Sequence, residues 1–422
     1  MQILRALNLV LTLVFSLCCA YRILYLALPL LLREKPLPPS GGKHRFAVLI
    51  CARNEAAVIG GLLESLRRQT YPADKLQVFV MADNCTDGTA AAARAGGAKV
   101  YVRTDRQRVG KGYALEALMA HLRADHPEGF DAYLVFDADN ILEPDYVEQM
   151  DRSFSSGLEI VTGYRSSLNY DSSWVSAGYS LWFLRESRYL NHARHLLGVS
   201  CAVSGTGFLF SRAVAEEMGG WPFHLLTEDI EFTAWQILRG RRIGFCAGAV
   251  LYDEQPVSFR QSCRQRLRWS RGYLQVFRRC GPRLVRGALK GSFSCYDLCM
   301  SVLPVVALSG FALAAQLLPG IRDALTGGGL PALLRPLAQW LGGSYLLLFL
   351  TGLWTAVTEW KRIRTGPGRK LASLFTFPLF MLTYLPIGAA ALFCDPGWKP
   401  IRHGNAGDRP LPLRRKPEDA GA

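Results

Sequence analysis

The sequence predicts an α/β domain, with a mixed and mainly parallel sheet flanked by helices, joined to α-helical transmembrane segments. Short β-rich runs alternate with helical stretches between residues 43 and 252, as in sheets built from strand–helix units. Uncharged apolar runs near both ends of the chain are long enough to span a membrane. Hydrophobic residues make up 50% of the 422 positions, a high share for a chain that also needs a soluble surface.

Four strands are expected in the first half of the domain. They cover Phe46–Cys51, Leu76–Met81, Lys99–Arg103 and Ala132–Phe136. Helices are expected from about Ala56 to Gln69 and from Gly112 to Arg123. Ligands of such sheets bind beyond the carboxyl ends of the strands. The polar side chains at these ends are therefore candidate site residues: Arg53, Glu55, Asp83, Asp137 and Asp139.

Three C-terminal runs lack charged residues for more than the roughly 18 positions that mark a spanning helix. They are Leu298–Ile321, Leu337–Thr358 and Leu371–Cys394. The N-terminal stretch is apolar on both sides of Arg22. A cleaved signal peptide is the alternative, but the apolar stretch is too long and lacks a small-x-small cleavage site. We expect an uncleaved anchor at residues 1–32 and about three transmembrane helices within residues 293–394.

Lys and Arg near the helix ends predict the orientation. They follow the first anchor and fill the loop between the third and fourth segments, so both regions are expected on the cytosolic side. The prediction is an integral protein of the plasma membrane with its α/β domain, residues 43–252, in the cytosol. Four crossings would place the basic tail, residues 395–422 and expected to be disordered, outside. Pro378 and Pro386 offer a break in the last segment, so the side of the tail stays open.

The formal net charge of +15 indicates an anionic partner. Ten Lys or Arg and no acid lie between Gln255 and Tyr296, directly before an apolar block. This placement favours anionic lipid of the cytosolic leaflet. No nucleic-acid partner is expected, because no recognition module is present. Residues 253–292 are expected to form basic amphipathic helices at the membrane interface.

Asp137-Ala138-Asp139 directly follows a predicted strand. Two carboxylates this close repel each other, and a hard divalent cation that also binds a diphosphate relieves the repulsion. Capping of the following loop is the alternative, but the position at a strand end favours Mg²⁺ or Mn²⁺ at Asp137 and Asp139. No GxGxxG follows the first strand and no GxxxxGK[ST] is present, which argues against dinucleotide and P-loop sites.

Two further motifs lie later in the chain. Thr227-Glu228-Asp229 opens a predicted helix, and a helix cap explains one of these residues but not the adjacent acids. The alternative is a general base for an acceptor hydroxyl. In Gln265-x-x-Arg268-Trp269, helical spacing puts the three named side chains on one face. Arg can neutralise a pyrophosphate and Trp can stack on a sugar, although the same helix can also lie on lipid.

In this order, the motifs resemble those of the membrane-bound family 2 glycosyltransferases. That family includes cellulose, hyaluronan, chitin and poly-N-acetylglucosamine synthases and exopolysaccharide transferases. The resemblance covers about Ala47 to Trp269. The motifs are Ala52-Arg53-Asn54-Glu55, Asp83-Asn84-Cys85-Thr86-Asp87-Gly88-Thr89, Gly110-Lys111-Gly112, Asp137-Ala138-Asp139, Ser204-Gly205-Thr206-Gly207, Thr227-Glu228-Asp229 and Gln265-x-x-Arg268-Trp269.

The resemblance implies a GT-A fold and an inverting, metal-dependent transfer from a UDP-sugar to a glycan or lipid acceptor, in cell-surface polysaccharide synthesis. It implies Asp229 as the base. The implied donor contacts are Arg53, Glu55, Asp83, Lys111, Asp137 and Arg268. The implied acceptor contacts are Gly205, Thr206, Glu228, Gln265 and Trp269.

Two alternatives stay open at this point. The first is a synthase that adds one sugar to a lipid, similar to ceramide or diacylglycerol glucosyltransferases. The second is a membrane scaffold with a degenerate transferase fold, although none of the expected acids is missing. Four spans leave room for only a small channel, so export or assembly partner proteins are a further expectation for a polymer product.

Overall fold

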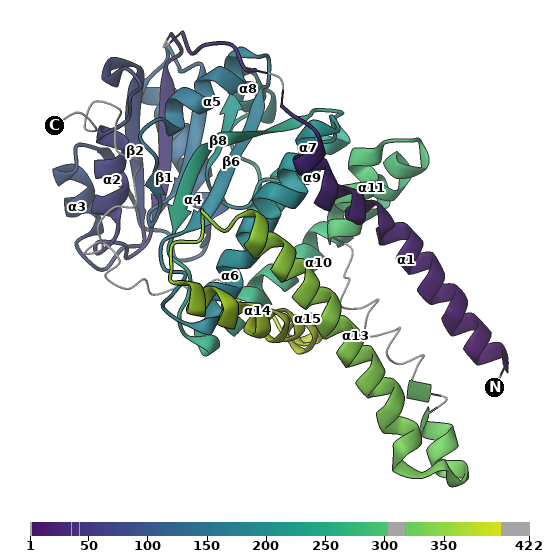
Figure 1. Cartoon of the computed structure of the whole chain (residues 1–422). Coiled ribbons are helices and arrows are strands. Elements are labelled where there is room, and N and C mark those ends of the chain that lie inside the picture. The colour runs from purple at the N-terminus through teal and green to yellow at the C-terminus, as the bar shows by residue number, and fades with distance from the viewer. Residues whose placement is uncertain (1, 35, 42, 303–316, 319, 398–422) are drawn as a thin grey trace.

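The computed structural model describes residues 2–34, 36–41, 43–302, 317–318 and 320–397 (Figure 1). Its centre is an eight-stranded sheet in the order β3-β2-β1-β4-β7-β6-β8-β5. The strands are β1 (Phe46–Ala52), β2 (Leu76–Asp83), β3 (Lys99–Arg103), β4 (Ala132–Asp137), β5 (Ile141–Leu142), β6 (Ile160–Ser167), β7 (Phe208–Ser211) and β8 (Ile243–Asp253).

The sheet is mixed and mainly parallel, as predicted. β3, β2, β1 and β4 run parallel, β7 is antiparallel to both β4 and β6, and β8 is parallel to β6. The four expected strands are confirmed, and three extend further at their carboxyl ends. Asp83 and Asp137 are consequently the last residues of β2 and β4. Their side chains therefore start at the edge where such sheets bind ligands.

Helices cover both faces of the sheet, because alternate residues of the central strands point to opposite sides. In β1, Val48 packs with helix α2 on one face, and Leu49 packs with α4 on the other. The helices of this domain are α2 (Ile59–Arg67), α3 (Thr89–Ala95), α4 (Lys111–Asp125), α5 (Tyr146–Ser155), α6 (Trp174–Arg185), α7 (His192–Leu196), α8 (Arg212–Met218) and α9 (Glu228–Leu238). Between α6 and α7 lies a π-helical segment, η2 (Glu186–Asn191).

The remaining helices lie on one side of the domain. They are α1 (Gln2–Leu31), α10 (Phe259–Leu289), α11 (Phe293–Val302), α13 (Gly329–Thr358), α14 (Pro367–Leu382) and α15 (Tyr384–Phe393). In Figure 1, α1 and α13 extend away from the domain in the same direction. The indole Nε1 of Trp354 in α13 donates a hydrogen bond of 3.2 Å to the carbonyl of Leu26 in α1. Both helices have their C-terminal ends at the domain (Figure 1). The region after α1 and the loop after α13 therefore lie at the same end of the two helices, as the prediction of both on one side of the membrane requires.

Two helical segments within the described part of the chain are long and apolar enough to cross a membrane: Gly329–Thr358 and Pro367–Phe393. The described apolar part of α1, Ser16–Leu31, is shorter. The predicted span Leu298–Ile321 begins in α11 but lies mostly outside the described residues, as does most of the tail at residues 395–422.

The last apolar segment is divided into α14 and α15 at Thr383, between the two prolines expected to break it, but Pro367–Phe393 still forms one candidate span. Pro386 has no N–H to donate to the preceding turn. Nearby, the carbonyl of Phe380 and the hydroxyl of Thr383 accept hydrogen bonds of 3.0 and 2.7 Å from Nη1 of Arg266. Arg266 is fully buried, with its guanidinium 4.3 Å from the ring centre of Phe380. A side chain of α10 thus fixes the junction of α14 and α15.

Candidate active site

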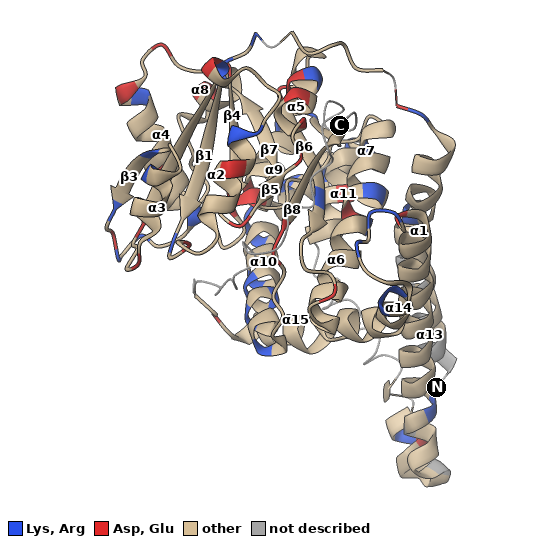
Figure 2. Ribbon diagram, turned by 60° about the vertical axis from the view of Figure 1, so that its left-hand side comes forward, with Lys and Arg blue, Asp and Glu red and all other residues tan. Residues whose placement is uncertain are grey.

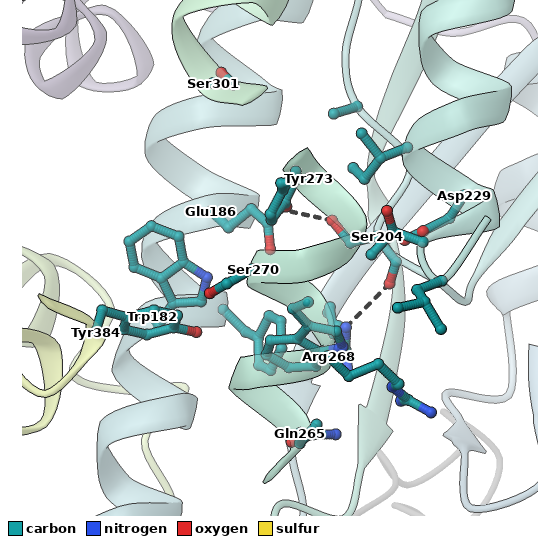
Figure 3. Close-up of a pocket in the computed structure, with 18 of the residues that line it drawn as sticks. Trp182, Glu186, Ser204, Asp229, Gln265, Arg268, Ser270, Tyr273, Ser301 and Tyr384 are labelled. Atoms are coloured by element: carbon teal, nitrogen blue, oxygen red, sulfur yellow. Dashed lines mark hydrogen bonds between the residues drawn. The ribbon is translucent and has the colours of Figure 1, made fainter. Parts of the chain in front are cut away.

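A cavity of about 710 Å³ extends from the carboxyl ends of the sheet strands to the outer helices. Residues at the ends of β1 and β2 line its sheet end: Arg53, Glu55 and Asp83. The other predicted residues that line it are Lys111, Asp137, Asp139, Gly205, Glu228, Asp229, Gln265, Arg268 and Trp269. Its far end is lined by side chains of α11, α13 and α15. Figure 3 shows part of the wall, with Asp229 on one side and Arg268 and Gln265 on α10. Of the residues predicted for the site, Thr206 is absent from this lining.

The sheet end of the cavity is built by two turns with left-handed backbone conformations. Asn54 and Asn84 follow β1 and β2 with φ of 58° and 53°. Short polar side chains tolerate this conformation when they bond locally. Oδ1 of Asn54 accepts the Thr86 N–H at 2.7 Å, and Oδ1 of Asn84 accepts the Asp105 N–H at 3.0 Å. The two asparagines thereby fix the shape of this end.

Asp83 has a partner that the sequence analysis did not identify. Nη1 of Arg103 in β3 donates to Oδ1 of Asp83 at 2.6 Å, and both side chains are largely buried. Because β2 and β3 are parallel neighbours, Asp83 and Arg103 lie side by side in register. Arg103 therefore holds the Asp83 carboxylate in position at the edge of the cavity.

Lys111 reaches the centre of the cavity from the start of α4. Its Nζ donates to Oδ1 of Asp137 and, at 2.6 Å, to the carbonyl of Gly205. Burial opposes the charge of Lys111, but nearby Asp137 and Glu228 outweigh this effect and raise its pKa, so it remains a cation. The glycine before it adopts a φ of 144°, and a Cβ on Gly112 would lie 2.0 Å from the Phe223 carbonyl. Gly110 is therefore required by its backbone conformation, and Gly112 by the close approach of the Phe223 carbonyl.

The loop after β4 is held by Thr206 and Asn140. The Asp137 N–H donates to Oγ1 of Thr206 at 2.9 Å and to Oδ1 of Asn140 at 3.2 Å. The Thr206 hydroxyl also donates to Asn140. Thr206 is 4% exposed. This placement does not support the acceptor contact expected of Thr206; its hydroxyl instead fixes the turn that carries Asp137 and Asp139.

The neighbouring Gly205 marks the point where the two acidic motifs converge. It has a φ of +80°, and a Cβ at this position would lie 3.8 Å from Oδ2 of Asp229 and 3.9 Å from Oδ2 of Asp137. The absence of a side chain therefore keeps open the space between these two carboxylates. A small reacting group can enter there from the cavity.

Glu228 and Asp229 form the first turn of α9. Thr227 at the N-cap position makes no side-chain cap hydrogen bond, whereas the Asp229 carboxylate accepts the N–H of Ile230, so capping by Asp229 stays an alternative. Burial is the largest cause that raises the pKa of Glu228 to about 8 and that of Asp229 to about 6. The N–H of Ile230 and the charge of Lys111 limit the rise for Asp229. Near neutral pH, Asp229 can therefore accept a proton while Glu228 holds one.

The predicted face of α10 is confirmed, because Gln265, Arg268 and Trp269 all line the cavity. Within the described residues, Oε1 of Gln265 and Nε of Arg268 are buried without a hydrogen-bond partner. Buried polar groups normally have partners, so these atoms indicate a bound ligand. Trp269 packs edge-on against Tyr179 and Phe183, with ring centres 5.8 and 6.3 Å away. Its ring is therefore already oriented by aromatic neighbours.

The structure adds charged cavity residues that the sequence analysis did not identify, among them Arg165, Glu186 and Asp253. Nε of Arg165 donates to Oδ2 of Asp253 at 2.6 Å, and Nη1 donates to the Ser204 carbonyl at 3.0 Å. The Ser204 hydroxyl donates to Oε1 of Glu186 at 2.6 Å (Figure 3). Asp253 ends β8 as Asp83 and Asp137 end their strands, so the same sequence signal could have identified it. Arg165 and Glu186 have no comparable signal.

Asp137 and Asp139 fit a divalent cation by their chemistry. Both carboxylates line the cavity and supply hard oxygen donors. Within the described chain there is no group of three or more His, Cys, Asp or Glu side chains placed to hold a metal. Two carboxylates match a Mg²⁺ or Mn²⁺ whose remaining ligands are diphosphate oxygens and water.

Residues 44–272, more than half of the chain, match the family model described as glycosyltransferase like family 2. The chain belongs to this family. It is accordingly a glycosyltransferase, with the GT-A architecture expected from the motifs.

Curated relatives of this family 2 glycosyltransferase resemble it over its catalytic half. A probable glycosyltransferase, YdaM, of Bacillus subtilis (strain 168) is 26% identical over 245 residues, 54% of this chain and 55% of that protein. The β-monoglucosyldiacylglycerol synthase of Synechocystis sp. (strain ATCC 27184 / PCC 6803 / Kazusa) is 25% identical over 236 residues, 54% of this chain and 48% of that one. The chain spans about half the length of these relatives.

A solved structure shares the fold over nearly the whole length. The mannosyltransferase PcManGT from Pyrobaculum calidifontis, in complex with GDP-Man and Mn²⁺, has a TM-score of 0.57 and 20% identity. The match covers 92% of this chain and 99% of PcManGT. This likeness supports the arrangement of the GT-A sheet.

Proposed function

We propose that this family 2 glycosyltransferase transfers a sugar from a UDP-sugar to a membrane-associated acceptor, with inversion and with a divalent cation. The cavity carries the proposal: it joins Asp83, the Asp137–Asp139 pair and Asp229 to a far end between outer helices. Such a path suits a soluble donor that enters at the sheet and an acceptor that approaches from the membrane.

The donor is proposed to occupy the sheet end. Glu55 and Asp83 would hold the uridine, with Arg53 nearby, and Lys111 and Arg268 would face the diphosphate. Asp137 and Asp139 would hold Mg²⁺ or Mn²⁺, which neutralises diphosphate charge when bound. The uridine assignment comes from the motif resemblance. A titration with UDP and GDP tests it: tighter binding of GDP would show that the donor carries guanosine and not uridine.

The chemical step follows from the position of Asp229. The acceptor hydroxyl attacks the anomeric carbon from the face opposite UDP. As the new carbon–oxygen bond forms and the bond to UDP breaks, Asp229 takes the hydroxyl proton. Arg268 and Lys111 stabilise the charge that develops on the departing diphosphate. Glu228, Gly205, Gln265 and Trp269 would border the acceptor.

Two acceptor classes fit this site. A growing glycan would give a cell-surface polysaccharide and would call for export or assembly partner proteins. A lipid would give a glycolipid, as the printed name of the Synechocystis relative implies for that protein. The leucine side chains at the far end of the cavity favour an acceptor with a hydrocarbon part.

The domain is proposed to lie on the cytosolic face of the plasma membrane, with the basic side of α10 on anionic lipid. Figure 2 shows Lys and Arg gathered along α10. The exposed basic residues of this helix are Arg260, Arg264, Arg278, Arg279, Arg283 and Arg286. Residues 253–292 would thus form the interface between the catalytic domain at 43–252 and the membrane helices.

The test is sugar transfer by the purified full-length protein in lipid nanodiscs. UDP release is measured with UDP-Glc, UDP-GlcNAc, UDP-Gal and UDP-GlcA, with GDP-Man as the comparison, and products are analysed by mass. The expected result is turnover of one UDP-sugar, abolished by EDTA, with an anomeric configuration opposite to that of the donor. Retention of configuration, or full activity in EDTA, would overturn the proposed mechanism.

A further inference from the structure

Three arginines from different helices are candidates for a second charged site, apart from the residues proposed to bind the donor. They are Arg22 in α1, Arg185 at the end of α6 and Arg194 in α7. Arg22 and Arg194 line the cavity. Arg22 and Arg194 also donate to the same hydroxyl, that of Ser301, at 3.4 and 3.2 Å. Burial, followed by the neighbouring charge of Arg22, lowers the pKa of Arg185 to about 10; the charge of Glu186 opposes this effect and Arg194 adds to it.

Arg194 and Arg22 have partners. Nε of Arg194 donates to Oδ2 of Asp297 at 2.5 Å, and its other nitrogens bond Asn191 and Ser301. Arg22 donates through Nη2 to the Met300 carbonyl at 3.1 Å and through Nε to a tyrosine hydroxyl. Asp297 is thus occupied by Arg194, and it accepts a further hydrogen bond from a tyrosine.

Arg185 differs from both. Within the described chain it makes no hydrogen bond and no ion pair, and its Nε is buried. Its guanidinium carbon lies 5.3 Å from the ring centre of Trp182, a cavity residue. The adjacent carboxylate, Glu186, accepts the hydrogen bond of Ser204. Arg185 is not itself among the residues that line the cavity, but its helical neighbours Trp182 and Glu186 are. Buried cations are normally paired, so an arginine without a hydrogen bond or ion pair at this position indicates an anionic ligand.

The helix that carries Arg185 connects this cluster to the reaction centre. Trp182, Glu186, Leu190 and Arg194 all line the cavity, at intervals of four residues. In a regular α-helix, residues four apart drift gradually around the helix and away from the cavity, because one turn takes 3.6 residues. The π-helical segment η2 widens the turn and keeps these residues on one face. At its inner end Glu186 bonds Ser204, next to Gly205 and the Asp229 carboxylate.

The position separates this cluster from the donor site. Lys111 and Arg268 lie beside Asp137 at the centre of the cavity, whereas Arg22 belongs to an apolar helix that leaves the domain. Arg22 and Arg194 contact α11, and the cavity is also lined by apolar side chains of α11, α13 and α15. These are Leu298, Val302, Leu347, Leu348 and Leu385.

We propose that Arg185 and Arg22 form a subsite for a phosphate group on the acceptor, and that the acceptor is a phosphate-bearing lipid. The phosphate would lie between the two guanidinium groups, whose planar N–H donors match its oxygens. The hydrocarbon part would follow the leucines, and the reacting hydroxyl would extend along Glu186 towards Asp229. The role as an acceptor subsite rests on the proposed function, whereas binding of the phosphate does not require turnover.

The test is lipid binding by the full-length protein in detergent, counted by native mass spectrometry. Phosphatidic acid and phosphatidylglycerol are compared with uncharged diacylglycerol and with inorganic phosphate. We expect both phospholipids to bind at least tenfold more tightly than either comparison ligand. Arg185→Gln and Arg22→Gln should each weaken phospholipid binding at least tenfold and leave UDP binding unchanged. Arg94→Gln, which removes an exposed arginine of α3 that does not line the cavity, is the matched control and should bind as wild type.

Equal binding of diacylglycerol, or wild-type phospholipid affinity in Arg185→Gln, would overturn the subsite. Equal binding of inorganic phosphate would overturn the lipid assignment. Arg185→Gln removes an unpaired charge and should not lower the Tm of lipid-free protein, whereas Arg194→Gln leaves Asp297 unpaired and should lower it. If Arg185→Gln does not fold, the phospholipid affinity of Arg22→Gln tests the subsite in its place. If phospholipid binding depends on the arginines but no sugar is transferred, the proposed function is refuted and the subsite stands. If Arg185→Gln transfers sugar with an unchanged acceptor KM, the subsite is refuted and the proposed function stands.

Discussion

Replacement of Gly205 by alanine tests whether the space between Asp137 and Asp229 is where the reaction takes place. The new methyl group would lie 3.8 and 3.9 Å from Oδ2 of Asp229 and Asp137, which is ordinary van der Waals contact. No protein atom has to move to admit it. The cost to folding is therefore the left-handed backbone at φ +80°, roughly 1–2 kcal/mol for a residue with a Cβ.

The effect on transfer should be larger than the effect on stability. An acceptor oxygen must come within about 2.6–3.2 Å of the Asp229 carboxylate to give up its proton, and the methyl group would occupy that approach. A displacement of about 1 Å can cost on the order of 10²-fold in rate. We expect Gly205→Ala to lower kcat/KM for transfer at least tenfold.

Gly97→Ala is the matched control. Gly97 has a nearly identical φ of +85° in an exposed turn, and a Cβ there would meet no atom within 4 Å. Both variants should lose similar free energy of unfolding, measured by chemical denaturation of the solubilised protein, but only Gly205→Ala should lose transfer. Rates within twofold of each other would refute the assignment of this space to the reacting groups.

Three further predictions follow from the site and its surroundings. Asp139→Ala should abolish transfer and should not be rescued by excess Mn²⁺, measured by UDP release; Asp145→Ala, an acid outside the cavity, is the control. The pKa of Asp229, raised to about 6, predicts that kcat falls as pH drops through 6, because protonation removes the base; a pH–rate profile that is flat from 5 to 8 would contradict this. Neutralising Arg278, Arg283 and Arg286 should weaken binding to phosphatidylserine vesicles by about 1 kcal/mol per residue and leave binding to phosphatidylcholine unchanged.

The sheet and most of the site could be predicted because their signals are local. Short apolar runs that end in acids identified β2 and β4 together with Asp83 and Asp137. Helical spacing correctly placed Gln265, Arg268 and Trp269 on one face of α10. These patterns depend only on the periodicity of strands and helices.

The remaining features depend on contacts between distant segments. Thr206 was expected at the acceptor, but its hydroxyl bonds the Asp137 turn, 69 positions away in the chain. Arg103 supports Asp83 through strand pairing that only the sheet order determines. Arg185 carries no sequence signal at all, because its lack of a partner becomes visible only when α1, α6 and α7 are packed together.

The central claim is that Asp229 is the catalytic base, and Asp229→Asn tests it most directly. Asparagine keeps the size of the side chain but cannot accept a proton near neutral pH. The initial rate of transfer and a UDP titration are measured on the same variant. We predict a rate loss of about 10²-fold or more with UDP affinity unchanged, since the donor contacts lie elsewhere in the cavity. A near wild-type rate with normal UDP binding would remove Asp229 from the mechanism, and loss of both would make it a donor-site residue.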